Sequence, residues 1–165
     1  GTIFPKEHDL WKQFKQVEIA FSIDDTGERF EYERTGADWN TVVQNLEQFK
    51  NLRTEYKNVS LIICSTVSAY NVLYLDQIAK WRDEQQFDVK HWNILHEKTA
   101  LSITSLPDNA KQIVTQKLLS NNKSEFESIV NFMNNTDTND IQLLDQRRNE
   151  SLEKVFPELN QLMQR

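Results

Sequence analysis

The sequence predicts an α/β fold, in which a parallel strand-helix-strand-helix-strand portion is followed by a helical C-terminal extension. Apolar, β-branched and aromatic residues concentrate in three short runs, 17–23, 59–64 and 87–95, as is typical of strands. Between these runs, apolar residues recur every three or four positions over 39–56 and 71–85, which indicates helices with one apolar face. Because connections of roughly 20 residues or more join the runs, we expect parallel pairing with right-handed crossovers.

A short helix over residues 9–14 is expected to lead into the first strand at 17–23. That strand is apolar except for Ser22, and we expect both of its faces to be buried. Residues 24–27 then supply a turn, because Asp side chains bond nearby amides and Gly accepts a positive φ. The charged segment that follows, 28–37, is expected to be a loop.

The next helix is expected to begin after Asp38, which can cap it, and to lay its apolar stripe on the sheet. The second strand is expected to end in a polar tip formed by Ser65 and Thr66. The third strand is the weakest prediction, because polar residues interrupt it. The carboxyl ends of parallel strands lie along one edge of a sheet, so we expect function at that edge.

The pattern changes after the third strand, and helices alone are expected in the C-terminal part. The expected helical segments start at Pro107 and lie at 107–118, 126–133, 141–152 and 159–163. We therefore predict two parts, a sheet-containing part over residues 1–106 and a helical extension over residues 107–165.

Composition limits the classes of function. The 165 residues, 38% of them hydrophobic, can bury a core but make at most one ordinary domain or a piece of a larger protein. The net charge of -6 and the scattered Lys and Arg argue against binding to nucleic acid. No apolar stretch approaches the roughly 20 residues that span a bilayer, and no secretory signal precedes the first helix, so we expect a cytoplasmic protein without membrane contact. The chain begins Gly-Thr without Met, so we expect its natural start to lie upstream.

Several segments between Val17 and Leu118 carry a family resemblance. They are Phe21-Ser22-Ile23-Asp24-Asp25, Phe30-Glu31-Tyr32-Glu33-Arg34-Thr35-Gly36-Ala37, Asp38-Trp39, Ser65-Thr66-Val67 with Asn71-Val72, and Leu101-Ser102-Ile103 with Leu106-Pro107. Together they resemble the second half of the partial barrel of radical S-adenosylmethionine enzymes, particularly the twitch-containing group. In that family a strand often ends Ser-Ile-Asp-Gly before a Glu-Tyr-x-Arg-like loop, and here Asp25 replaces the Gly.

One motif of that family is absent from this chain. The Cys-x3-Cys-x2-Cys motif, which holds a [4Fe–4S] cluster, lies early in the family's barrel, whereas Cys64 is the only cysteine here. The resemblance therefore implies strands four to six of a partial (β/α)6 barrel, followed by the start of a C-terminal extension. It implies that the intact parent uses S-adenosylmethionine and a [4Fe–4S] cluster, and that this chain alone binds neither group and is inactive.

Ser22 and Asp24 are candidate cofactor-binding residues. Side chains two residues apart on a strand point to the same face, where a hydroxyl and a carboxylate could bond the ribose and amino groups of S-adenosylmethionine. A capped turn explains the same two residues without a ligand. Ser22 is the more informative of the two, because it interrupts a run expected to be buried and needs a hydrogen-bond partner there.

Arg34 and Thr66 complete the candidate site. A guanidinium can make a fork-shaped contact with the methionine carboxylate of the cofactor, although Arg34 could equally pair with Glu31 or Glu33 at the surface. Thr66 could bond polar groups of the cofactor or serve only to start the following helix. The predicted cofactor-binding set is Ser22, Asp24, Arg34 and Thr66, with no catalytic residue and no metal ligand.

Other polar and aromatic residues favour structural roles. His91 and His96 do not have the spacing of a helical metal site, so a metal is not expected there. Trp39, Trp81 and Trp92 lie in elements that need core residues, so packing explains them better than a stacking platform.

Two functions remain open from the sequence. The first is a fragment of a radical S-adenosylmethionine enzyme that contributes part of the cofactor site. The second is a noncatalytic α/β module that associates through its sheet edge or its helical tail. A three-stranded sheet leaves an edge exposed, so we expect a second copy of the chain or a missing upstream part to complete it.

Overall fold

The structure is a computed structural model that describes residues 3–96, 99–120, 124–134 and 151–163. The chain divides into two compact units. The first unit comprises Gly1–Ser65 and Lys80–Trp92, and the second comprises Thr66–Ala79 and Asn93–Arg165. The division expected between residues 106 and 107 stays a prediction.

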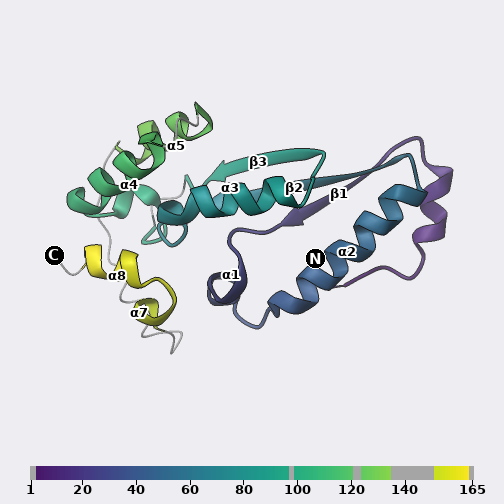
Figure 1. The fold of residues 1–165 in the computed structure, drawn as a ribbon, viewed down its shortest axis with the longest axis horizontal. Coiled ribbons are helices and arrows are strands. Elements are labelled where there is room, and N and C mark those ends of the chain that lie inside the picture. Colours follow the sequence, from purple (N-terminus) through teal and green to yellow (C-terminus); the bar gives the residue numbers. More distant parts are fainter. Residues whose placement is uncertain (1–2, 97–98, 121–123, 135–150, 164–165) are drawn as a thin grey trace. The chain divides into compact units, whose positions relative to one another are not determined.

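The described residues alternate strands and helices up to β3 and continue as helices (Figure 1). In chain order, with η marking 3-10 helices, the elements are η1 (His8–Gln13), β1 (Val17–Ser22), α1 (Gly27–Glu33), α2 (Trp39–Glu55), β2 (Val59–Val67), η2 (Val72–Tyr74), α3 (Leu75–Glu84), β3 (Val89–Ile94), η3 (Ile103–Ser105), α4 (Asp108–Ser120), η4 (Ser124–Phe126), α5 (Glu127–Met133), α7 (Leu152–Val155) and α8 (Pro157–Met163). The strands form one parallel sheet in the order β1-β2-β3, which confirms the predicted α/β class.

The first unit packs α2 on one face of the sheet. β1 and β2 pair in parallel register, from Val17 opposite Val59 to Ser22 opposite Cys64. The apolar stripe predicted for α2 is buried together with alternate residues of the two strands. The buried residues include Val42, Leu46, Phe49 and Leu52 of α2 with Phe21, Leu61 and Ile63 of the strands. Each such side chain contributes about 1.5–3 kcal/mol when it is fully buried, so this layer holds the first unit together.

The start of α2 agrees with the prediction. The Asp38 carboxylate accepts the Thr41 N–H at 2.6 Å and so caps the helix. Trp39, the first residue of α2, packs against Trp81, with their ring centroids 5.3 Å apart. The guanidinium of Arg82 lies 4.0 Å from the Trp92 ring centroid in a cation–π contact. These tryptophans therefore pack inside the first unit.

The opposite face of the sheet is more open than predicted. Exposure alternates along β1, where Phe21 is 1% exposed but Glu18, Ala20 and Ser22 are exposed. The prediction that both faces of this strand are buried is therefore wrong. Larger apolar residues occupy every second position of β1, as in a strand with one buried face. Ala20 lies between two of them, so the sequence resembles a continuous apolar run.

The segment after β1 is also different from the prediction. Residues 28–37 were expected to be a loop, but most of α1 lies among them. Phe30 and Tyr32 of α1 are buried, and tertiary packing of these aromatic residues stabilises a helix that is too short to form alone. Gly27 begins α1 with a φ of 61°, which confirms the positive φ expected there.

β2 continues further than the predicted strand. Its burial alternates up to Val67, which is 0% exposed. Ser65 and Thr66 therefore lie within the strand, and the predicted polar tip beyond its end is wrong. The Ser65 hydroxyl donates to the Ile23 carbonyl at 2.6 Å, which satisfies this buried polar group inside the sheet.

The second unit is built mainly from helices. α4 packs against η2, α5 and α8. Apolar residues of these elements are almost completely buried. They include Val72, Ala110, Val114, Leu118, Ile129, Met133 and Leu159. This confirms the helices predicted from Pro107, at 126–133 and at 159–163, whereas most of the predicted segment 141–152 lies outside the described residues. Among the helices that the structure describes, none has both the length and the apolar character that crossing a bilayer requires.

Candidate functional site

Three of the four predicted site residues meet where β1 ends. The Nε and Nη2 atoms of Arg34 donate to one carboxylate oxygen of Asp24, at 3.0 and 2.6 Å. Nη2 also donates to the Ser22 hydroxyl at 3.0 Å. The Asp24 side chain is only 10% exposed, whereas that of Arg34 is 39% exposed. A hydroxyl, a carboxylate and a guanidinium thus form one polar group of residues, termed the Arg34 cluster below.

The position of Arg34 follows from α1. The chain reverses at Gly27, and the last turn of α1 closes where the Arg34 N–H donates to the Phe30 carbonyl at 2.9 Å. Phe30 packs against Trp39 with ring centroids 5.2 Å apart, which joins α1 to α2. The guanidinium is therefore positioned by the C-terminal end of a packed helix, which Arg34 directly follows.

Two details of the Arg34 cluster differ from the alternatives raised by the sequence. Ser22 is exposed, so the idea that burial makes it need a partner is wrong, although its hydroxyl does accept a hydrogen bond. The carboxylate bonded to Arg34 is that of Asp24, while Glu31 accepts the Trp39 N–H at 2.8 Å.

A second ion pair lies beside the Arg34 cluster. The Nε atom of Arg29 donates to Asp25 at 2.9 Å, and the Thr26 N–H donates to the other carboxylate oxygen at 2.7 Å. The Asp25 side chain is 0% exposed. Burial raises the pKa of Asp25, and the hydrogen bond and charge of Arg29 oppose that rise. The adjacent Asp24 and Asp25 therefore have different arginine partners, as expected for side chains pointing to opposite faces.

Glu33 is a third carboxyl in this region. Its Oε1 atom is shut off from solvent, although the residue as a whole is half-buried. Burial raises the pKa of Glu33 well above its usual value, and the negative charges of Asp25 and Asp24 add to this effect. Two carboxylates and two guanidinium groups, from Asp24, Asp25, Arg29 and Arg34, form two ion pairs beside this enclosed carboxyl.

Thr66, the fourth predicted site residue, belongs to the second unit. Its carbonyl accepts a hydrogen bond from the Asn71 side-chain amide at 2.8 Å, and the Asn71 side-chain oxygen accepts the Ser68 N–H at 2.9 Å. The structure thus brings together Ser22, Asp24 and Arg34 in the first unit. Thr66 lies near the end of β2, and its carbonyl is bonded by the turn that leads towards η2.

The part of the chain that the structure describes contains no group of three or more His, Cys, Asp or Glu residues arranged to hold a metal ion. Cys64 is half-buried on β2, and His91 is exposed on β3.

Comparison of this chain with protein-family models, with curated proteins and with solved structures gives no match. The assignment of a function therefore depends on the residues and their geometry.

Sequence reasoning missed two features of the structure. The first is the group formed by Asp25, Arg29 and Glu33. These residues are spaced four apart, a spacing that brings side chains together only on a helix, and the segment was expected to be a loop. Lys111 occupies a position on the buried stripe of α4, three residues before Val114, where an apolar residue is expected. A charged residue on an apolar stripe is a signal that the sequence does contain.

Proposed function

We propose that this chain is part of a radical S-adenosylmethionine enzyme of the twitch-containing group, in which the Arg34 cluster binds the polar end of S-adenosylmethionine. The observation that carries the proposal is the convergence of Ser22, Asp24 and Arg34 at the carboxyl end of β1. Ligands of α/β proteins commonly bind at this edge of a parallel sheet. These residues also belong to the segments through which the sequence resembles the family.

The Arg34 cluster fits the amino-acid end of this cofactor. A guanidinium matches a carboxylate, whereas a carboxylate and a hydroxyl match an ammonium group. In the chain without ligand, Asp24 accepts two hydrogen bonds from Arg34. Binding would replace part of this ion pair with contacts to the ligand, and the 39% exposure of the Arg34 side chain leaves room for that exchange.

The one-sided sheet supports assignment to a partial (β/α)6 barrel. The helix α2 covers one face of β1 and β2, while Glu18, Ala20 and Ser22 on the other face of β1 are exposed. In a (β/α) barrel the helices lie outside, and the opposite face of each strand lines the interior. Under this proposal β1, β2 and β3 are strands four to six, and Ser22 faces the interior.

The residues of this chain do not fit a [4Fe–4S] cluster. Such a cluster is held by several Cys thiolates, and Cys64 is the only cysteine. In the intact enzyme under this proposal, cysteines outside this chain would hold the cluster, which would supply the electron chemistry. The part proposed for this chain is to bind and orient the cofactor, and the chain alone is proposed to be noncatalytic.

The test starts from the coding sequence upstream of Thr2, which should encode an in-frame Cys-x3-Cys-x2-Cys motif. In the reconstituted intact enzyme, Arg34→Met should weaken binding of S-adenosylmethionine about tenfold or more, because a charge-assisted hydrogen bond contributes about 1.5–3 kcal/mol. Isothermal titration calorimetry under anaerobic conditions measures the dissociation constant.

The matched control is Arg53→Met, since Arg53 makes a comparable ion pair with Asp88 at 3.0 Å elsewhere in the first unit. Its cofactor affinity should equal that of the unmodified enzyme. An upstream sequence without the motif, or an unchanged affinity for Arg34→Met, would contradict the proposal. A [4Fe–4S] absorbance from the 165-residue chain alone would also contradict it.

The second candidate function is association of two copies through the sheet edge. It is favoured by β3, an edge strand on which Val89 is 39% exposed and His91 is exposed. Unpaired backbone groups of an edge strand can template pairing with another chain. Light scattering at increasing protein concentration should then give the mass of a dimer, and Val89→Lys should shift it to the monomer. A chain that stays monomeric at high concentration would exclude this mode of association.

A further inference from the structure

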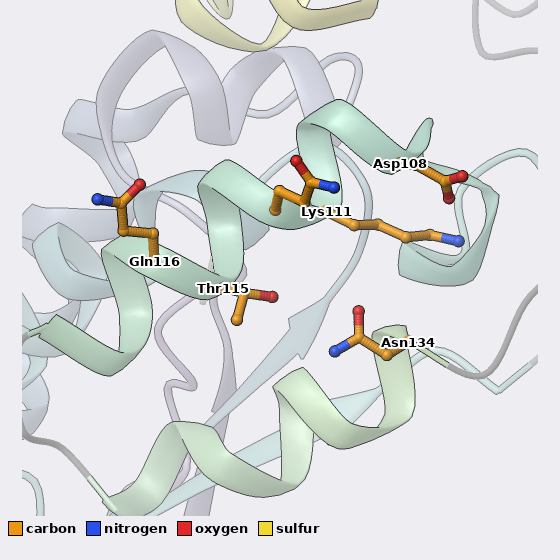
Figure 2. Close-up of a pocket in the computed structure, with 6 residues that line it drawn as sticks. Asp108, Lys111, Thr115, Gln116 and Asn134 are labelled. Atoms are coloured by element: carbon orange, nitrogen blue, oxygen red, sulfur yellow. The ribbon is translucent and has the colours of Figure 1, made fainter.

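A polar cavity of about 450 Å³ lies beside α4 in the second unit (Figure 2). It is lined by Asp108, Lys111, Gln112, Thr115 and Gln116 of α4 and by Asn134, which follows α5. Sites for small molecules have volumes of roughly 300–1,000 Å³, so this cavity can accommodate one. None of its residues belongs to the Arg34 cluster.

Lys111 is the unusual member of this lining. The residue is only 6% exposed. Figure 2 shows its side chain extending from α4 towards the space between Asp108 and Asn134. Within the described residues, no hydrogen bond or ion pair involves its Nζ atom. Lys117 on the same helix differs, because its ammonium lies 3.6 Å from the Asp76 carboxylate.

Folding alone gives no reason for a lysine at this position. The stem of Lys111 is buried with the apolar stripe of α4, but its Nζ atom reaches the cavity, since it is not among the solvent-inaccessible polar atoms without a partner in the described residues. Val114 and Leu118 continue the same stripe of α4 and are 0% exposed, so an apolar residue would suit position 111. The ammonium therefore presents to the cavity a positive charge that is unpaired among the described residues, and an anion there can form a charge-assisted hydrogen bond with it.

The remaining groups of the cavity limit the chemistry of that anion. Lys111 is the only cation among the described residues of the lining, and Asp108 places a carboxylate in the same lining, so a dianion such as phosphate is disfavoured. The three side-chain amides and one hydroxyl can both donate and accept hydrogen bonds. We propose that this cavity binds a small molecule of the amino-acid class, with its carboxylate on Lys111 and its amine directed towards Asp108.

The test is a titration of the full chain with each standard amino acid, with sodium acetate and with inorganic phosphate. Nuclear magnetic resonance follows the backbone amide signals of α4. We expect at least one amino acid to give saturable shifts with a dissociation constant in about the millimolar range or tighter. Acetate should bind more weakly, since it lacks the amine, and phosphate should not saturate. Absence of saturable binding by every amino acid, or tighter binding of phosphate, would overturn the proposal.

Lys111→Met removes the ammonium and keeps a side chain that can pack on α4, so it tests whether the charge is needed for binding. This variant should bind the best amino acid at least about tenfold more weakly, which corresponds to about 1.4 kcal/mol. Its melting temperature should equal or exceed that of the unmodified chain. Lys117→Met, on the same helix but outside the lining, should keep the affinity. If Lys111→Met does not fold, Thr115→Val should still weaken binding; unchanged affinity in a folded variant overturns the proposal.

Discussion

Arg29→Met is expected to lower the free energy of unfolding by about 3–5 kcal/mol at neutral pH. The variant removes the guanidinium that lies 2.9 Å from Asp25, whose side chain is 0% exposed. The Thr26 N–H remains as a hydrogen-bond donor to this carboxylate, but it carries no compensating charge. A buried carboxylate without its cation is strongly destabilising, which makes this one of the two largest effects expected. Urea unfolding followed by circular dichroism gives the free energy.

Lys90→Met is the matched control, because Lys90 and Asp83 form an ion pair of side chains that are 35% and 62% exposed. Such a surface pair contributes at most about 1 kcal/mol, so the control should remain close to the unmodified chain. Adding Asp25→Asn to Arg29→Met should recover part of the lost stability, since the buried charge is then absent. If Arg29→Met costs no more than Lys90→Met, the Asp25–Arg29 pair does not stabilise the fold.

The strands and the longer helices could be predicted from hydrophobic periodicity. α2 is the clearest case, because its apolar stripe and its cap at Asp38 both appear in the sequence and in the structure. β1 and β2 also agree, because runs of β-branched and aromatic residues are distinctive. The pattern does not reveal how many faces of the sheet are covered, since this depends on which elements pack there.

The helix α1 could not be predicted because its stability is not local. A helix of seven residues is unstable by itself, and its charged residues suggest a loop. Burial of Phe30 and Tyr32 provides the tertiary contacts that stabilise it. The sequence could identify Ser22, Asp24 and Arg34 as candidate site residues. Their contact depends on α1, because this helix brings Arg34 back to the end of β1.

The two arginine pairs and Glu33 link the stability of α1 to the candidate site. Arg29 and Glu33 lie on α1, and Arg34 directly follows it. Both arginines lower the pKa of Glu33, while Asp24 and Asp25 raise it. A change in the protonation of Glu33 therefore alters the charge next to the Arg34 cluster, so the pH dependence of stability reports on this site.

Glu33→Gln is expected to stabilise the chain at neutral pH and to change its stability little at about pH 4. Burial raises the pKa of Glu33 in the folded state, whereas its pKa in the unfolded chain is about 4.3. Between these two values the folded state binds more protons, so stability falls as the pH rises through this window. Each unit by which the folded pKa is raised costs about 1.4 kcal/mol above that window. Glutamine keeps the shape and has no proton to lose.

The free energy of unfolding should be measured from about pH 4 to pH 8 for the unmodified chain and for Glu33→Gln. Burial also raises the pKa of Asp25, whereas hydrogen bonds lower the pKa of Asp38. Because both proteins carry these groups, the difference between the two curves reports mainly on Glu33. That difference should grow as the pH rises and then level off above the folded pKa. Glu47→Gln, at an exposed position of α2, is the control for replacing a carboxyl by an amide at the surface. A flat difference for Glu33→Gln would mean that this carboxyl titrates as in water and that α1 does not enclose it.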